Sequence, residues 1–233
     1  MMNKIISMLW LRSRQIITNP QLLILILLPY LFVFLYEKAF PESAMTTELI
    51  LFVCLPMILT LSVGNLILTI VAEEKEKNNI RDLYLAGVKS SEYLISTLFI
   101  PIIIGISGII LVPLIINYNI TENFLSYLTI TLMTMLSIAL INLFIALVSS
   151  TVSQATVLAL PLTLIAMLLP MFSLLNKTVE RINKFTFMGS FTEYVSPTET
   201  FKFDNTSFIS LLVWIFISLI LIYFNFNKSK KNS

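Results

Sequence analysis

Long apolar stretches alternate with short polar segments along this chain. The cores of six stretches lack Asp, Glu, Lys and Arg. Each stretch reaches about the 20 residues that a helix needs to cross a bilayer. The sequence therefore predicts an all-α membrane protein with six transmembrane helices in one domain over residues 1–233, the helices covering about 20–40, 49–72, 94–116, 125–149, 155–175 and 208–226.

Residues 3–18 show a different pattern, in which apolar side chains recur at helical spacing and the cations lie mostly on the other side. A basic amphipathic helix that carries a tryptophan is typical of the membrane interface. We therefore predict an N-terminal interfacial helix, with Trp10, Arg12 and Arg14 as its characteristic residues. Asn19 is the expected N-cap of the first span, and Pro20 its first helical residue.

Composition agrees with this pattern and narrows the chemistry. The chain is 57% hydrophobic and 12% charged, with a net charge of +2 and no histidine. A soluble chain of 233 residues could not bury so much apolar surface. Histidine bases and ligands are excluded, and the single cysteine cannot form an intrachain disulfide. We expect neither catalytic residues nor a metal site, no nucleic-acid partner, and no enzyme activity in this chain.

The distribution of basic residues predicts the orientation. Six spans put both termini on one side, and that side carries ten of the 15 basic residues, while the other side carries five. Because cytoplasmic loops are richer in Lys and Arg, we predict cytoplasmic termini, in the cytoplasmic membrane of a bacterium. The long connection 176–206 is then external, and its aromatic residues predict that it packs on the membrane face or dips into it.

Charge is concentrated in one connection, residues 73–93, between the second and third spans. Nine of the 28 charged residues of the chain lie between Glu73 and Glu92. A solvated turn that anchors two spans is the simplest interpretation. However, Glu74, Lys75, Glu76 and Lys77 are followed by apolar side chains at the spacing of a helix face, namely Ile80, Leu83 and Tyr84. This second pattern predicts an amphipathic helix that docks on a cytoplasmic partner.

The same connection carries turn and capping signals after that helix. Gly87 indicates a turn. Ser90 or Ser91 is the expected cap of the third span, and Glu92 would lie in its first turn, where the helix dipole favours an anion.

The segment EEKEKNNIRDLYLAGVKSSEYLISTLF resembles the connection between spans two and three of ABC-2 type permeases, the membrane subunits of ATP-binding-cassette exporters. Glu74-Lys75-Glu76 is similar to the start of the family pattern, and Gly87-Val88 is similar to its turn. RSRQIITNPQLLILILLP also resembles the opening of that family. The usual Gly-Thr is replaced by Asn78-Asn79, and asparagine tolerates the left-handed backbone that a kink needs.

The resemblance implies a function and partners. The chain would be the permease subunit of an exporter for an amphipathic or lipophilic substrate, possibly a peptide. It would bind a separate P-loop ATPase that holds ATP and Mg, and a second permease, identical or paralogous. No nucleotide-binding domain is expected in the chain itself, which has five glycines and no P-loop motif. The implied coupling residues are Glu74, Lys75, Glu76, Ile80, Leu83, Tyr84 and Gly87.

Polar residues at depth give a weaker signal. Asn65 in the second span and Asn142 in the fourth are candidates for a substrate path. Helix packing and hydrogen bonding between helices is the alternative interpretation of the same residues. The spans lack buried charge, which argues against ion or proton coupling.

Two other functions stay open at this stage. A channel or secondary transporter would also have several spans, although intramembrane carboxylates or a polar pore stripe would be expected. An immunity or assembly subunit could bind a hydrophobic peptide without moving it. The substrate, the choice between homodimer and heterodimer, and the conformation of 176–206 do not follow from the sequence.

Overall fold

The protein is a bundle of long helices in this computed structural model, which describes residues 2–39, 47–118, 124–196, 203 and 205–231. Every regular element in these residues is a helix. Six helical segments are long and apolar enough to span a membrane, which confirms the predicted all-α, multi-pass fold. They are α2 (Pro20–Ala39), the continuous segment α3–η1–α4, α6 (Ser90–Ile115), α7 (Phe124–Val148), α8 (Val152–Leu175) and α11 (Thr206–Lys231).

The second span is the centre of the bundle. It consists of α3 (Thr47–Met57), the π-helical η1 (Ile58–Asn65) and α4 (Leu66–Glu76), and it is largely buried, whereas α2, α8 and α11 expose most of their surface. The wider turns of η1 begin just after Pro56, whose ring nitrogen cannot donate a helical hydrogen bond. Gly64 lets α7 approach closely, since a Cβ there would lie 2.6 Å from Nδ2 of Asn142.

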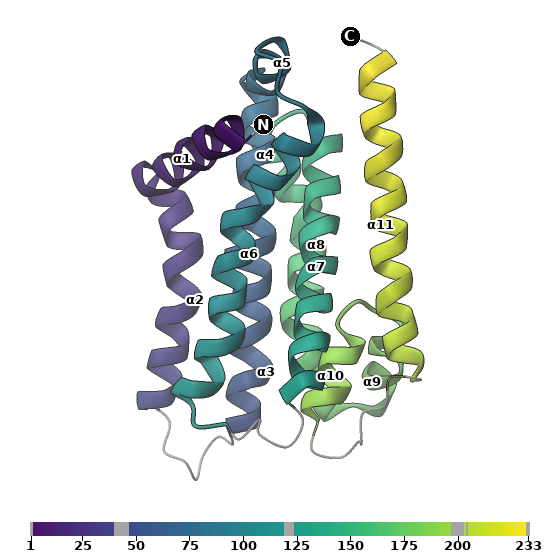
Figure 1. Ribbon diagram of the computed structural model, residues 1–233. Helices are drawn as coiled ribbons and strands as arrows, with labels where there is room; N and C mark the ends of the chain where they lie inside the picture. The colour runs from purple at the N-terminus through teal and green to yellow at the C-terminus, as the bar shows by residue number, and fades with distance from the viewer. Residues whose placement is uncertain (1, 40–46, 119–123, 197–202, 204, 232–233) are drawn as a thin grey trace.

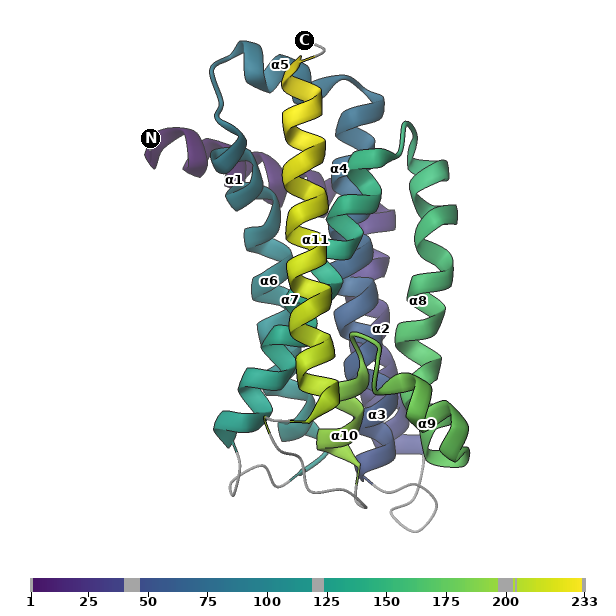
Figure 2. The ribbon, with the colours of Figure 1, turned by 90° about the vertical axis from the view of Figure 1, so that its right-hand side faces the viewer.

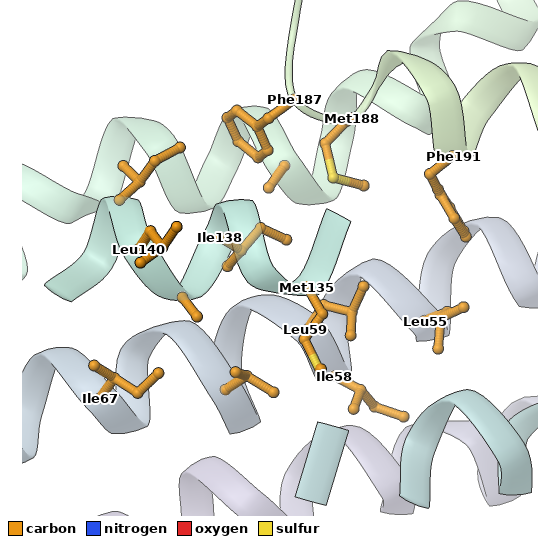
Figure 3. Packing of buried hydrophobic residues seen from close by; sticks show 14 of the residues in the cluster. Leu55, Ile58, Leu59, Ile67, Met135, Ile138, Leu140, Phe187, Met188 and Phe191 are labelled. Carbon is orange, nitrogen blue, oxygen red and sulfur yellow. The ribbon is translucent and has the colours of Figure 1, made fainter. Parts of the chain in front are cut away.

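Side chains from three parts of the chain form the main core (Figure 3). Leu59 of the second span lies beside Met135 of α7, and Leu55 lies toward Phe191. Ile58 points away from α7 toward α6, where a Cβ at Gly108 would lie 2.6 Å from its Cγ2. Residues near α10 (Gly189–Val195) close this core at one end, namely Phe187, Met188 and Phe191. In the segment after 176, Phe187 and Phe191 are buried in this core, whereas Phe185 is exposed, and the prediction that this segment packs on the membrane face or dips into it stays a prediction.

The two ends of the bundle carry different short elements (Figures 1 and 2). Both termini lie at one end, called here the terminal end. There α1 (Met2–Thr18) crosses the bundle, and α5 (Asn79–Leu85) projects beyond it. At the opposite end lie α9 (Lys177–Asn183) and α10. The yellow helix α11 stands beside α7 and joins the rest of the bundle mainly through α7 and α10.

The first residues of α2 and α6 can be compared with the N-caps predicted for the first and third spans. Asn19 caps α2 as predicted, because its Oδ1 accepts a hydrogen bond from the backbone nitrogen of Gln21 at 3.0 Å. The predicted cap of the third span was wrong by one residue: α6 begins at Ser90, and Lys89 is the N-cap. Glu92 explains the shift, since its carboxylate accepts a hydrogen bond from the backbone nitrogen of Lys89 at 2.9 Å.

Candidate functional site

A buried ion pair joins α1 to the second span at the terminal end. Arg12 of α1 is 1% exposed and Glu74 of α4 is 3% exposed. The two side chains meet face to face: Nη1 of Arg12 donates to Oε1 of Glu74, and Nη2 donates to Oε2 at 2.8 Å. Such bidentate geometry is the strongest arrangement of these two groups. Arg12 therefore points into the protein, contrary to the expectation that the cations of this helix face outward.

Two side chains of α6 complete this pair. The hydroxyl of Tyr93 donates to Oε2 of Glu74 at 2.9 Å, and Nη2 of Arg12 donates to Oγ1 of Thr97 at 2.9 Å. The guanidinium carbon of Arg12 also lies 5.6 Å from the centre of the Tyr93 ring. We call these four residues the Arg12–Glu74 node. The node ties α1, α4 and α6 together, because each helix supplies at least one of its members.

The next two residues of α4 hold the connection between α7 and α8. Nζ of Lys75 donates to the carbonyl oxygen of Leu147 in the last turn of α7. Oε2 of Glu76 accepts a hydrogen bond from the backbone nitrogen of Val152, the first residue of α8, at 2.8 Å. A cation at a helix C-terminus and an anion at a helix N-terminus both complement the helix dipoles. The run Glu74-Lys75-Glu76 thus contacts four other helices from one end of α4.

The predicted amphipathic pattern of this connection is divided between two helices. Glu73 to Glu76 belong to the end of α4, and the apolar positions Ile80, Leu83 and Tyr84 belong to α5. Asn78 separates the two helices in the left-handed conformation, with φ of 59°, so the predicted kink at this asparagine is confirmed. Gly87 makes the second predicted turn, with φ of +76°.

Helix α5 has no buried residue, and Leu85 at its end is 77% exposed. Ile80, Leu83 and Tyr84 are half-buried. The turn after the helix is held by α1, since Nζ of Lys4 donates to the carbonyl oxygen of Gly87 at 2.8 Å. On the α4 side Lys77 pairs with Glu73, and the hydrogen bond and charge of that carboxylate raise the pKa of Lys77. The end of α5 thus presents an exposed apolar side chain, Leu85.

The outer face of α1 carries the other predicted interfacial residues. Trp10 is 62% exposed, and the guanidinium of Arg14 lies 5.4 Å from its ring centre. Further apolar side chains of α1 are exposed on the described surface, namely Ile6, Leu11 and Ile17. The helix therefore presents apolar groups outward, while Met8, Arg12 and Ile16 face the bundle.

Asn65 and Asn142, the two candidates for a substrate path, each contact a neighbouring helix. Oδ1 of Asn65 accepts a hydrogen bond from Thr163 of α8 at 3.3 Å. Asn142 is 1% exposed, donates to the carbonyl oxygen of Ile138 at 2.9 Å, and packs against Gly64. Its Oδ1 has no hydrogen-bond partner among the described residues. These contacts favour a packing role for both asparagines.

Sequence reasoning missed Tyr93 and Thr97, the members of the node from α6. A signal was present, because polar side chains recur at helical spacing in the first turns of that span, at Tyr93, Ser96 and Thr97. Arg12 and Glu74 were both identified, but their pairing was not, since 62 residues separate them.

Comparison with protein-family models, with curated proteins and with solved structures gives no significant match to this chain. Across the residues that the structure describes, His, Cys, Asp and Glu form no group that could hold a metal ion. Any functional assignment therefore depends on the residues and contacts described above.

Proposed function

We propose that this chain is the permease subunit of an ABC-2 type exporter. In this proposal α1 is the interfacial helix, α5 is the coupling helix that docks on a separate P-loop ATPase, and both termini are cytoplasmic. ATP hydrolysis in that ATPase drives an amphipathic or lipophilic substrate outward across a bacterial cytoplasmic membrane. A second permease copy or a paralogue completes the transporter.

The observation that carries the proposal is the arrangement of α5 relative to the bundle. This short helix lies beyond the ends of α2 and α8 and exposes the apolar side chain of Leu85. The charged end of α4 precedes it and contacts α1, α6, α7 and α8 through directional bonds. A displacement of α5 by a docked protein would therefore be passed through α4 to the centre of the bundle.

The contacts also divide the proposed coupling residues into two groups. Ile80, Leu83, Tyr84 and Leu85 lie on α5, where a partner can reach them. Glu74 is buried in its ion pair with Arg12, so its contribution to coupling acts through the node. Lys75 and Glu76 act in the same indirect way, through the connection between α7 and α8.

Co-purification in mild detergent tests the proposal. The tagged chain is isolated from its native membrane, and every co-purifying chain is identified by mass. We expect a stoichiometric P-loop ATPase, whose ATP turnover rises when the exported substrate is added. Stimulated turnover separates export from simple binding of a hydrophobic peptide.

A matched pair of variants makes the test specific for α5. Leu85→Asp places a charge on the exposed end of α5, and it should remove the ATPase from the complex while the chain still inserts and folds. Leu85→Met is the control, because it keeps an apolar side chain at the same exposed position. The proposal is wrong if the unmodified chain is isolated without an ATPase across several detergents.

A further inference from the structure

A pocket at the opposite end lies outside everything described so far. It has a volume of about 410 Å³, within the range of roughly 300–1,000 Å³ that is usual for small-molecule sites. The end of α8, helix α9 and helix α10 line it. Its wall is mixed: Leu174 and Leu175 are apolar, while Lys177, Glu180, Lys184 and Glu193 carry charges.

The wall carries two carboxylates and two ammonium groups, and both carboxylates lie around Lys184. Its Nζ lies 3.3 Å from Oε1 of Glu193 and 3.6 Å from Oε1 of Glu180, so one ammonium serves two carboxylates. Glu193 is 7% exposed, and a buried anion demands compensation. Its other oxygen accepts a hydrogen bond from Nδ2 of Asn205 at 3.3 Å. Glu180 therefore lines the pocket with only a shared cationic partner.

The end of α8 favours a cation at the same place. This helix of 24 residues ends at Leu175, and residues of its last turn line the pocket. The last carbonyl groups of a helix lack helical partners and form the negative end of its dipole. The carboxylate of Glu180, which shares Lys184 with Glu193, and the end of α8 therefore both favour a positive group in the pocket. Lys177 is the first residue of α9, and its ammonium could pair with an anionic group of a ligand whose positive group enters the pocket.

The position of the pocket along the span indicates where such a ligand comes from. A helix of 24 residues is about 36 Å long, slightly more than the roughly 30 Å apolar layer of a bilayer. Its end therefore lies at the level of the lipid headgroups. Close by, Leu175, Ile182 and Phe185 are 74%, 57% and 66% exposed, as suits side chains that face acyl chains.

We propose that this pocket binds the headgroup of a zwitterionic phospholipid with a primary ammonium, as in phosphatidylethanolamine. The ammonium lies between Glu180, Glu193 and the last carbonyls of α8, and the phosphate lies toward Lys177. The glycerol and the upper acyl chains follow Leu174 and Leu175 out of the pocket. This site is independent of the proposed docking of an ATPase on α5, which lies at the other end of the molecule.

Native mass spectrometry of the delipidated full chain tests the proposal. The chain is titrated with phosphatidylethanolamine, its N,N-dimethyl form, phosphatidylcholine and phosphatidylglycerol. Phosphatidylethanolamine should bind about tenfold more tightly than phosphatidylcholine, which cannot donate hydrogen bonds to the carboxylates, with the dimethyl form between them. Phosphatidylglycerol, which lacks the ammonium, should bind no better than phosphatidylcholine. A photoreactive phosphatidylethanolamine should label peptides from residues 173–196.

A pair of variants tests whether phosphatidylethanolamine binds in this pocket. Glu180→Gln removes a rim carboxylate without disturbing the buried Glu193, and it should weaken binding of phosphatidylethanolamine about tenfold. Glu37→Gln is the control, because Glu37 pairs with Lys38 at 3.6 Å at the same end of the bundle but outside the pocket. Equal binding of all four lipids would overturn the proposal, as would equal effects of the two variants. Displacement of the lipid label by an amphipathic peptide that binds more tightly would instead identify a substrate site.

Discussion

The second span and α10 contact their neighbours differently at the two ends of the bundle. At the terminal end, charged side chains of α4 reach other helices through directional bonds, with Arg12, the carbonyl of Leu147 and the amide of Val152 as partners. At the opposite end, aromatic rings pack edge to face: the centroids of Phe52 and Phe191 lie 6.2 Å apart, and those of Phe187 and Trp214 lie 5.9 Å apart.

This difference has consequences for motion. A hydrogen bond or ion pair has one partner, and it breaks when the two groups move out of line. Closely packed aromatic rings have many neighbours, and separating them removes these contacts one after another. The terminal end is thus built from a few contacts that can break and reform as units. In an exporter driven from α5, we expect larger rearrangement around α4 and α1 than around α10.

The largest loss of stability is expected when one partner of the Arg12–Glu74 ion pair is removed. Glu74→Ala leaves the guanidinium of Arg12 buried without its counter-ion, and it should cost about 3–5 kcal/mol in the free energy of unfolding. Thermal unfolding of the purified chain in a single detergent measures the loss. Arg12→Ala should cost a similar amount, because it strands the carboxylate instead.

A double variant distinguishes a charge effect from a simple loss of packing. Arg12→Met with Glu74→Leu removes both charges and keeps most of the volume, so stability should recover to near that of the unmodified chain. If the double variant loses the sum of the two single losses, the ion pair is not what holds α1 to α4. Tyr93 and Thr97 would then carry the contact.

Phe191→Ala tests the opposite end. This ring of α10 is fully buried against Phe52 of the second span, and its removal should cost about 3 kcal/mol. We expect the lower end of the range for a buried phenylalanine, since Met188, one turn earlier, is flexible enough to fill part of the space. The same unfolding measurement applies.

The loss of stability in Phe191→Ala should not depend on salt concentration in the way that a loss at the Arg12–Glu74 node does. Salt concentration should leave the effect of Phe191→Ala unchanged, because no charge is involved. Phe185→Ala is the matched control: this ring lies on the same segment but is 66% exposed, and its loss should be small. Equal losses for the two rings would mean that α10 does not close the core.

The fold follows from the sequence where the signal is local. Six apolar runs define the spans, Asn78 and Gly87 define the two turns, and Asn19 defines the first cap, because each depends on a few neighbouring residues. The π-helical turns of η1 escaped prediction, since an α-helix and a π-helix share the same apolar pattern and differ only in the register of hydrogen bonds. The Lys89 cap escaped because the Glu92 side chain, not the capping serine, decided it.

The candidate site was harder to predict because it is built from distant residues. Glu74 and Arg12 were chosen for their local charge, yet an amphipathic pattern suggested that Arg12 faces outward. Its burial depends on Glu74, Tyr93 and Thr97, which only tertiary packing brings together. The role of Glu76 could not be predicted for the same reason. The amide that it caps belongs to Val152, 76 residues further along the chain.

Glu76 gives the smallest and most specific test of the terminal end. Glu76→Gln keeps a hydrogen-bond acceptor for the amide of Val152 but removes the anion from the start of α8, and it should cost about 0.5–1 kcal/mol at low salt. Because Glu76 is exposed, the loss should shrink as salt screens the charge. Lys77→Gln is the control, since its pair with Glu73 is exposed and lies within one stretch of chain. Unfolding at low and at high salt measures both variants. A loss that is insensitive to salt would show that Glu76 acts through packing, and the terminal end would then resemble the opposite end more than the contacts of α4 imply.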